Sequence, residues 1–151
     1  MKTATPAMPP TAVVSDASVV VKWFHERGEE GVESARALLE AYANERIALF
    51  VLDLTTYEVG NALLRGTAGA TPDSVATVLA ALDDVCPRIS LEPGERLLAA
   101  DLAKKHHLTF YDAAYAAAAR SRIGLLATFD AQLLSAGLGL HPSAVLERFA
   151  T

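Results

Sequence analysis

Four carboxylate side chains stand beside short apolar runs of the chain, where a fold of alternating strands and helices places its ligand-binding groups. They are Asp16, Glu58, Asp112 and Asp130. If those runs form parallel strands, their carboxyl ends meet at one edge of the sheet and bring these side chains together. Carboxylate oxygens without Cys or His beside them are the ligands that Mg²⁺ and Mn²⁺ prefer. The pattern therefore predicts a site for a hard divalent cation.

Helix capping is the alternative explanation for these acids, because each of them also stands where a helix is expected to begin. Two of them, in Thr55-x-x-Glu58 and Thr109-x-x-Asp112, match the capping-box pattern. The other two fit simple N-caps, each of which contributes about 0.5–2 kcal/mol. Four carboxylates gathered without a cation would repel one another, however, and a bound divalent cation removes that repulsion.

A cation held by such a cluster can generate hydroxide from water and neutralise charge on a phosphodiester during in-line displacement. The residues alone leave a nuclease, a metal-dependent phosphatase and a non-catalytic interaction module open. A phosphatase of the haloacid-dehalogenase type needs a second Asp two residues after the first, and this chain has Ser18 there. The chain also lacks the glycine-rich loop of a nucleotide-binding fold.

Short apolar runs alternate with longer segments of helical periodicity, which predicts an α/β fold with a central parallel sheet of four to five strands. The expected strands are 12–15, 47–52, 89–91, 125–128 and, at an edge, 138–141. The expected helices are 19–24, 32–42, 55–66, 72–82, 94–106, 111–118 and 131–136. The composition of 29 Ala and 21 Leu with only 3 Ile favours helices as the bulk of the structure over a β-sandwich.

The length of 151 residues and the 52% share of hydrophobic residues are typical of a single globular domain. We expect this domain over 12–151, after a flexible lead-in over 1–11 that has no periodicity. One cysteine, Cys86, and the lack of a long apolar run predict a cytoplasmic protein with no membrane span. The net charge of −5 argues against a broad basic surface for nucleic acid.

Four sequence motifs resemble those of PIN-domain ribonucleases, in particular the VapC toxins of bacterial and archaeal toxin–antitoxin pairs. The first is VSDASVVVKWF at 14–24, which is similar to the opening strand and helix of these proteins. The later motifs are YEVGNAL at 57–63, LTFYDAAY at 108–115 and LATFD at 126–130. The resemblance covers residues 12–137, and the order and spacing of the motifs make it specific.

This resemblance implies a three-layer α/β/α PIN fold and a Mg²⁺- or Mn²⁺-dependent endoribonuclease. The enzyme would be the toxin of a type II toxin–antitoxin system, held inactive by a VapB-like antitoxin. Metal-activated water would hydrolyse RNA phosphodiesters and leave a 5′-phosphate and a 3′-hydroxyl.

Carried over by position, the catalytic and metal-binding acids are Asp16, Glu58, Asp112 and Asp130. The supporting residues are Ser18, Asn61 and Thr128. The chain departs from the family pattern at Asp53, where an apolar residue or Pro is common, and at His25, where Leu is common. A homodimer is also expected, because the apolar helices at 32–42 and 75–82 exceed what one small sheet can cover.

Overall fold

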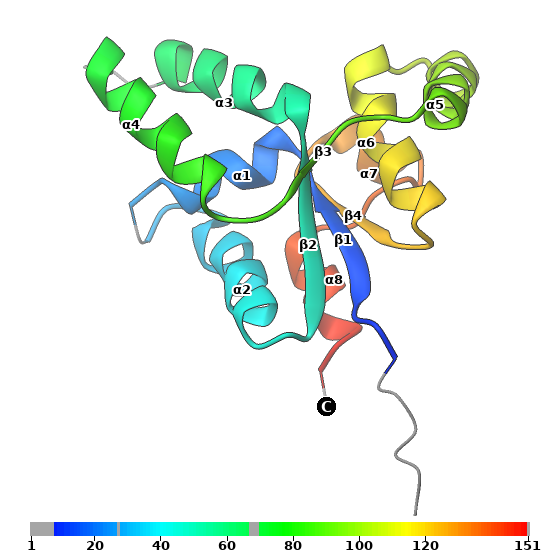
Figure 1. The fold of residues 1–151 in the computed structure, drawn as a ribbon, viewed down its shortest axis with the longest axis horizontal. Coiled ribbons are helices and arrows are strands. Elements are labelled where there is room, and N and C mark those ends of the chain that lie inside the picture. The colour runs from blue at the N-terminus through cyan, green and yellow to red at the C-terminus, as the bar shows by residue number, and fades with distance from the viewer. Residues whose placement is uncertain (1–7, 27, 67–69, 151) are drawn as a thin grey trace, which may run out of the picture.

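Four parallel strands form the centre of the molecule, in the spatial order β3-β2-β1-β4 (Figure 1). The computed structural model describes residues 8–26, 28–66 and 70–150. The strands are β1 (Thr11–Ser15), β2 (Ile47–Leu52), β3 (Arg88–Ile89) and β4 (Leu125–Ala127). In the register, Val13 of β1 lies opposite Leu49 on one side and Leu125 on the other. The predicted parallel sheet is confirmed.

Eight helices accompany the sheet within the described residues. They are α1 (Ala17–Trp23), α2 (Val32–Ala43), α3 (Asp53–Gly66), α4 (Pro72–Asp83), α5 (Pro93–His106), α6 (Phe110–Ser121), α7 (Ala131–Ser135) and α8 (Pro142–Glu147). Figure 1 shows α1 to α4 on one side of the sheet and α5 and α6 on the other. This arrangement confirms the α/β class with helices on both faces of the sheet.

Two hydrophobic cores lie on opposite faces of the sheet, because successive side chains of a strand point to opposite sides. Val13 packs into the core that α1, α2 and α8 cover, and Val14 packs into the core beneath α5 and α6. Both valines are fully buried. The central strand β1 therefore has no polar face, and its first polar groups inside the protein are Ser15 and Asp16 at its carboxyl end.

The start of α3 differs from the prediction, because the helix begins at Asp53 rather than at residue 55. One oxygen of Asp53 accepts a hydrogen bond from the Leu54 N–H at 2.9 Å, and the other accepts the Ser90 hydroxyl at 2.9 Å. Asp53 thus starts the helix and joins it to the segment after β3. This places Glu58 in the second turn of α3, so the predicted capping box at Thr55 is wrong.

The chain after α7 also differs from the prediction. Of the expected edge strand at 138–141, only Leu140 pairs with β4, in an isolated parallel bridge to Ala127. The short helix α8 then begins at Pro142, with His141 as its N-cap. Six residues are too few to display a helical periodicity, which is why the sequence did not predict it.

Most of the predicted lead-in at 1–11 lies outside the described residues, and within it Thr11 already belongs to β1. Residues 8–10 are exposed. Within the described ranges, no helix has the length and apolar character needed to cross a membrane.

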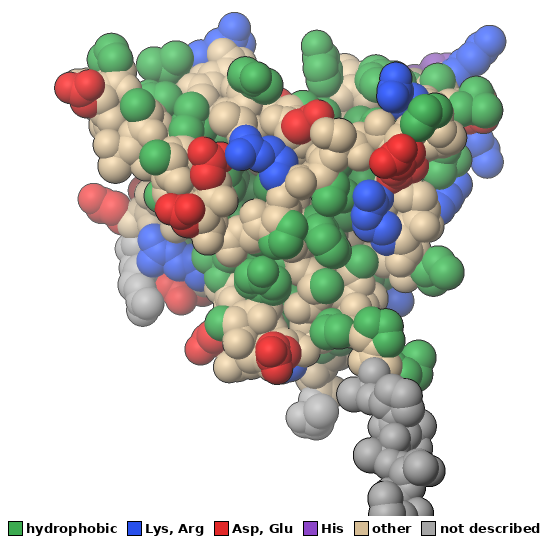
Figure 2. Space-filling model, viewed as in Figure 1, with side chains coloured by type: hydrophobic (Ala, Val, Ile, Leu, Met, Phe, Trp, Pro, Cys, Tyr) green, Lys and Arg blue, Asp and Glu red, His purple; other side chains and the backbone are tan. Residues whose placement is uncertain are grey.

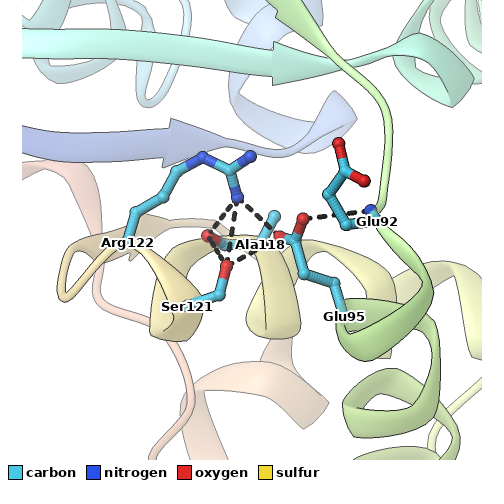
Figure 3. A network of polar contacts seen from close by, with 5 residues as sticks. All are labelled: Glu92, Glu95, Ala118, Ser121 and Arg122. Atoms are coloured by element: carbon cyan, nitrogen blue, oxygen red, sulfur yellow. Dashed lines mark hydrogen bonds and ion pairs between the residues drawn. The ribbon is translucent and has the colours of Figure 1, made fainter.

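A network of polar contacts around Glu95 joins α5 to the end of α6 (Figure 3). One Glu95 oxygen accepts hydrogen bonds from the Ser121 hydroxyl at 2.7 Å and from Arg122 Nη1 at 2.6 Å, and the other accepts the Glu92 N–H at 3.0 Å. Arg122 also donates to the carbonyl of Ala118 at 2.8 Å. Burial alone would raise the pKa of Glu95, but these hydrogen bonds outweigh burial and hold the pKa below its ordinary value.

We expect Arg122→Met to lower the free energy of unfolding at pH 7 by about 1–3 kcal/mol, because it leaves the Glu95 carboxylate buried without its charged donor. Since the pKa of Glu95 is lowered in the fold, its stabilisation is lost as the pH falls through that pKa, and the variant should then approach the parent. Urea unfolding at several pH values measures both effects. Arg120→Met is the control, because Arg120 is exposed near the end of α6. An equal loss in both variants would contradict the assignment.

Candidate active site

The carboxylate of Asp16 is buried at the carboxyl end of the central strand, with 4% of the residue exposed. It caps α1 by accepting the Val19 N–H at 3.3 Å. The hydroxyl of Ser18 donates to Oδ1 at 2.5 Å, and the hydroxyl of Thr128 donates to Oδ2 at 2.5 Å. Both oxygens of this carboxylate are therefore held by hydroxyl groups, one from the start of α1 and one from the end of β4.

The same two hydroxyls accept hydrogen bonds from the loop that follows β4. Ser18 Oγ accepts the Phe129 N–H at 2.9 Å, and Thr128 Oγ1 accepts the Asp130 N–H at 2.9 Å. Close packing also holds Thr128, because a Cβ on Gly139 would lie 2.6 Å from the Thr128 methyl group. A side chain at 139 would thus displace the residue that holds Asp16.

Glu58 lies on α3, and its carboxylate is held by Tyr115, which belongs to the core beneath α5 and α6. The Tyr115 hydroxyl donates to Glu58 Oε1 at 2.7 Å, and Tyr115 Oη lies 2.8 Å from Thr55 Oγ1. Thr55 Oγ1 also accepts the Leu52 N–H at 3.1 Å. From the sequence, Tyr115 is expected only within the helix over 111–118, and these contacts were not predicted. The available signal was that a buried tyrosine hydroxyl requires a hydrogen-bond partner.

The other two acids lie at the beginnings of helices. Asp112 is in the first turn of α6, where its N–H donates to Thr109 Oγ1 at 3.1 Å. Asp130 is the N-cap of α7 and accepts the Leu133 N–H at 2.9 Å. Both acids are partly buried. Helix capping is therefore one role of Asp16 and Asp130. It is not a role of Glu58, which lies in the second turn of α3.

The pKa values of three of these acids are raised, first by burial and further by the charges of neighbouring carboxylates. Burial raises the pKa of Asp16 from its ordinary 3.8 to about 6; its hydrogen bonds oppose that increase, and the charge of Asp112 adds to it. Burial also raises the pKa of Glu58, with the Tyr115 hydrogen bond opposing and the charges of Asp16 and Asp112 adding. The pKa of Asp112 is raised by burial and next by Asp130. An exposed carboxylate that did nothing but cap a helix would show the opposite shift, because the helix N-terminus stabilises its charge.

A model of the PIN-domain family matches residues 13–137. The chain belongs to the PIN-domain family. The family expected from the four motifs is thereby confirmed. A search among curated proteins finds no match.

Solved structures share this PIN fold over most of the chain. PAE2754 from Pyrobaculum aerophilum is 27% identical with a TM-score of 0.67, over 95% of this chain and 91% of that one. The Mycobacterium tuberculosis toxin VapC20, which cleaves the sarcin–ricin loop, is 18% identical with a TM-score of 0.63, over 83% and 95%. VapBC2 from Rickettsia felis, bound to DNA from its promoter, is 10% identical with a TM-score of 0.66, over 86% and 96%. At 18% and 10% identity, the likeness is one of fold.

The donor set of this PIN domain fits a hard cation that takes only part of its coordination shell from protein. The donors at this edge of the sheet are carboxylate oxygens, and Asp16 is ionised at neutral pH only against the cost of burial. Within residues 8–26, 28–66 and 70–150, no group of three His, Cys, Asp or Glu side chains is arranged to hold a metal by itself. Mg²⁺ commonly uses one or two carboxylates and completes its shell with water and substrate phosphate. Asn61, the remaining predicted residue, is exposed on α3 three positions after Glu58.

We expect Asp16→Asn to melt at or above the parent PIN domain at pH 7 in chelator, because it removes a buried charge. Since the folded pKa is raised, ionised Asp16 destabilises the fold at neutral pH, and the parent should gain up to about 3 kcal/mol from this group as the pH falls from 7 toward 4. Asp16→Asn should lose that gain. Asp73→Asn, at an exposed position in the first turn of α4, should keep it. Urea unfolding across this pH range measures the difference, and identical pH profiles for Asp16→Asn and the parent would refute the interpretation.

Proposed function

We propose that this PIN-domain protein is a Mg²⁺- or Mn²⁺-dependent endoribonuclease and the toxin of a type II toxin–antitoxin pair. The observation that carries the proposal is the buried Asp16 carboxylate, held by two hydroxyls at the carboxyl end of β1. Other carboxylates cluster near it, and the charges of Asp16 and Asp112 both add to the raised pKa of Glu58. Such a cluster is electrostatically unfavourable without a cation, and a divalent cation bound there offsets the repulsion. Solved toxins with the same fold, including one that cleaves the sarcin–ricin loop, support the same function.

In this proposal all four acids take part in binding one or two cations, with Asp16 and Asp112 as the main direct ligands. A bound cation supplies charge neutralisation at the phosphodiester and lowers the pKa of a bound water. The chain contributes rigidity: Ser18 and Thr128 hold Asp16 in one orientation before substrate arrives. Fixing the ligands in advance removes reorganisation from the reaction, which is how an electrostatic site gains rate.

Contact with RNA is proposed to be local to this site. The net charge is −5, and acidic and basic side chains are interspersed on the face drawn in Figure 2. A surface of this kind gives weak non-specific attraction to a phosphate backbone. The cation at the acidic edge is therefore the main source of positive charge for the substrate.

We expect purified protein to cleave structured RNA with added Mn²⁺ or Mg²⁺ and to stop in excess chelator, because the donors at the acidic edge are carboxylate oxygens. Asp16→Asn and Asp112→Asn should abolish cleavage, and Asp73→Asn should cleave like the parent. Gel electrophoresis of end-labelled RNA measures the reaction. Full cleavage in chelator would overturn the metal-dependent mechanism.

The same preparation distinguishes the two alternatives. A metal-dependent phosphatase would release phosphate from a simple aryl phosphate monoester and leave internal RNA bonds intact. A non-catalytic interaction module would do neither in the presence of Mn²⁺. Either result would contradict the ribonuclease proposal.

A VapB-like antitoxin partner and a cytoplasmic location belong to the same proposal. Structural neighbours of the chain include a toxin–antitoxin complex from Klebsiella pneumoniae and FitAcB from Neisseria gonorrhoeae. The only cysteine, Cys86, is buried and free, which suits a reducing compartment.

A homodimer is also part of the proposal, although the structure changes its basis. The apolar face of α2 is buried in the chain's own core, so it needs no partner. Large apolar side chains are instead exposed on α3, α5 and α6. They are Tyr57, Leu64, Leu97, Phe110 and Tyr111. Exposed apolar surface of this kind is favoured at subunit interfaces.

We expect light scattering at micromolar concentration to give about 32 kDa, twice the 16.0 kDa of one chain, because burying these side chains favours association. Dilution should shift the mass toward that of the single chain. A mass of one chain throughout the micromolar range would count against the dimer.

A further inference from the structure

A chain of hydrogen bonds runs from the end of β2 through two buried hydroxyl groups to the Glu58 carboxylate. Its first link is the Leu52 N–H, which donates to Thr55 Oγ1 at 3.1 Å. Thr55 Oγ1 lies 2.8 Å from Tyr115 Oη, and the Tyr115 hydroxyl donates to Glu58 Oε1 at 2.7 Å. The links join β2, α3 and α6, so the Glu58 side chain is tied to two elements besides its own helix.

The chemistry of the groups fixes the direction of this chain. A tyrosine hydroxyl has one proton, and an ionised carboxylate can only accept, so the proton of Tyr115 goes to Glu58. Tyr115 Oη must then accept the hydroxyl proton of Thr55. The Thr55 hydroxyl can donate this proton while its oxygen accepts the Leu52 N–H. Every proton has one position, and the array is polarised toward the carboxylate.

Burial isolates the two hydroxyls from competing partners. Tyr115 is 1% exposed and Thr55 is fully buried, while the Glu58 carboxylate is partly exposed. Tyr115 lies within a run of alanines on α6, in the core beneath α5 and α6. A phenylalanine would fill the same volume there. The hydroxyl therefore contributes little to packing, and its recorded contacts are to Thr55 and Glu58.

We propose that Tyr115 and Thr55 are positioning residues that fix Glu58 Oε1 and leave Oε2 as the oxygen that a divalent cation takes. This inference rests on the proposed metal-dependent function and adds a second hydroxyl clamp to the one on Asp16. The Asp16 clamp comes from the start of α1 and the end of β4. The Glu58 clamp comes from the interior of the opposite core, through residues that touch neither cation nor substrate.

Tyr115→Phe should weaken Mn²⁺ binding by about 10- to 100-fold, the usual effect of removing a group that orients a metal ligand. The affinity is measured by calorimetric titration of the protein with Mn²⁺ alone, without RNA. Tyr42→Phe, which removes a tyrosine hydroxyl from α2 in the other core, is the matched control and should bind Mn²⁺ like the parent.

Thr55 gives a second and independent test of the same chain. Thr55→Val keeps the shape and loses the hydroxyl, so it should weaken Mn²⁺ binding in the same direction as Tyr115→Phe. Thr55→Ser keeps the hydroxyl and should restore the affinity toward that of the parent. Equal affinities for Thr55→Val and Thr55→Ser would contradict the proposal.

A double-mutant cycle with Glu58→Gln separates positioning from a general loss of structure. If Tyr115 acts through Glu58, adding Tyr115→Phe to Glu58→Gln should change the Mn²⁺ affinity much less than it changes that of the parent. An undiminished loss in the Glu58→Gln background would overturn the inference. So would a Tyr115→Phe protein that binds Mn²⁺ as tightly as the parent. A parent protein that binds no Mn²⁺ would instead contradict the proposed function.

Discussion

Burial of the Asp16 carboxylate at the end of the central strand is the constraint on which the rest of this edge depends. A carboxylate at this depth requires hydrogen-bond donors, and the hydroxyls of Ser18 and Thr128 provide them. Because Ser18 is in the first turn of α1 and Thr128 follows β4, satisfying one side chain also determines how these elements meet. The pKa of Asp16 nevertheless stays raised, so the fold keeps this charge at a cost to its own stability.

The acids at this edge are held in two different ways, which reflects the two cores of the molecule. Asp16 is fixed at the edge of the sheet, by Ser18 in the first turn of α1 and by Thr128 directly after β4. Glu58 is fixed from inside the core beneath α5 and α6, by a side chain of α6. Strand ends and helix packing therefore contribute independently to the same site. A site built on rigid elements in this way loses little order when a ligand enters.

The sequence predicts best where periodicity and burial agree. The strand over 47–52 is predicted to the residue, because its side chains alternate into two apolar cores and a charged residue follows it. The acids after the strands are also predictable, since parallel strands put their carboxyl ends at one edge. The start of α3 is not, because Asp53 bonds both to Leu54 and to Ser90, and Ser90 is distant in the sequence.

The role of Tyr115 illustrates why part of the site is invisible in the sequence. Its position in an alanine-rich helix predicts a packing residue, and its side chain is indeed buried. The hydroxyl reaches Thr55 and Glu58 only because the fold brings the first turns of α3 within hydrogen-bond distance of Tyr115 on α6. The local pattern of apolar residues predicts which face of a helix is buried. It does not predict which polar atom of another element will be the hydrogen-bond partner of a side chain on that face.

The close packing of Gly139 against Thr128 makes the turn before α8 part of this edge, although the turn contributes no functional group. Any side chain at 139 would move Thr128 and loosen its hold on Asp16. In a mutational scan, substitutions at 139 should then lower activity as substitutions of the acids do. Asp16, which is far away in the sequence, thereby limits which residues this turn can accept. The tolerance of this turn to change is set by the chemistry that it supports.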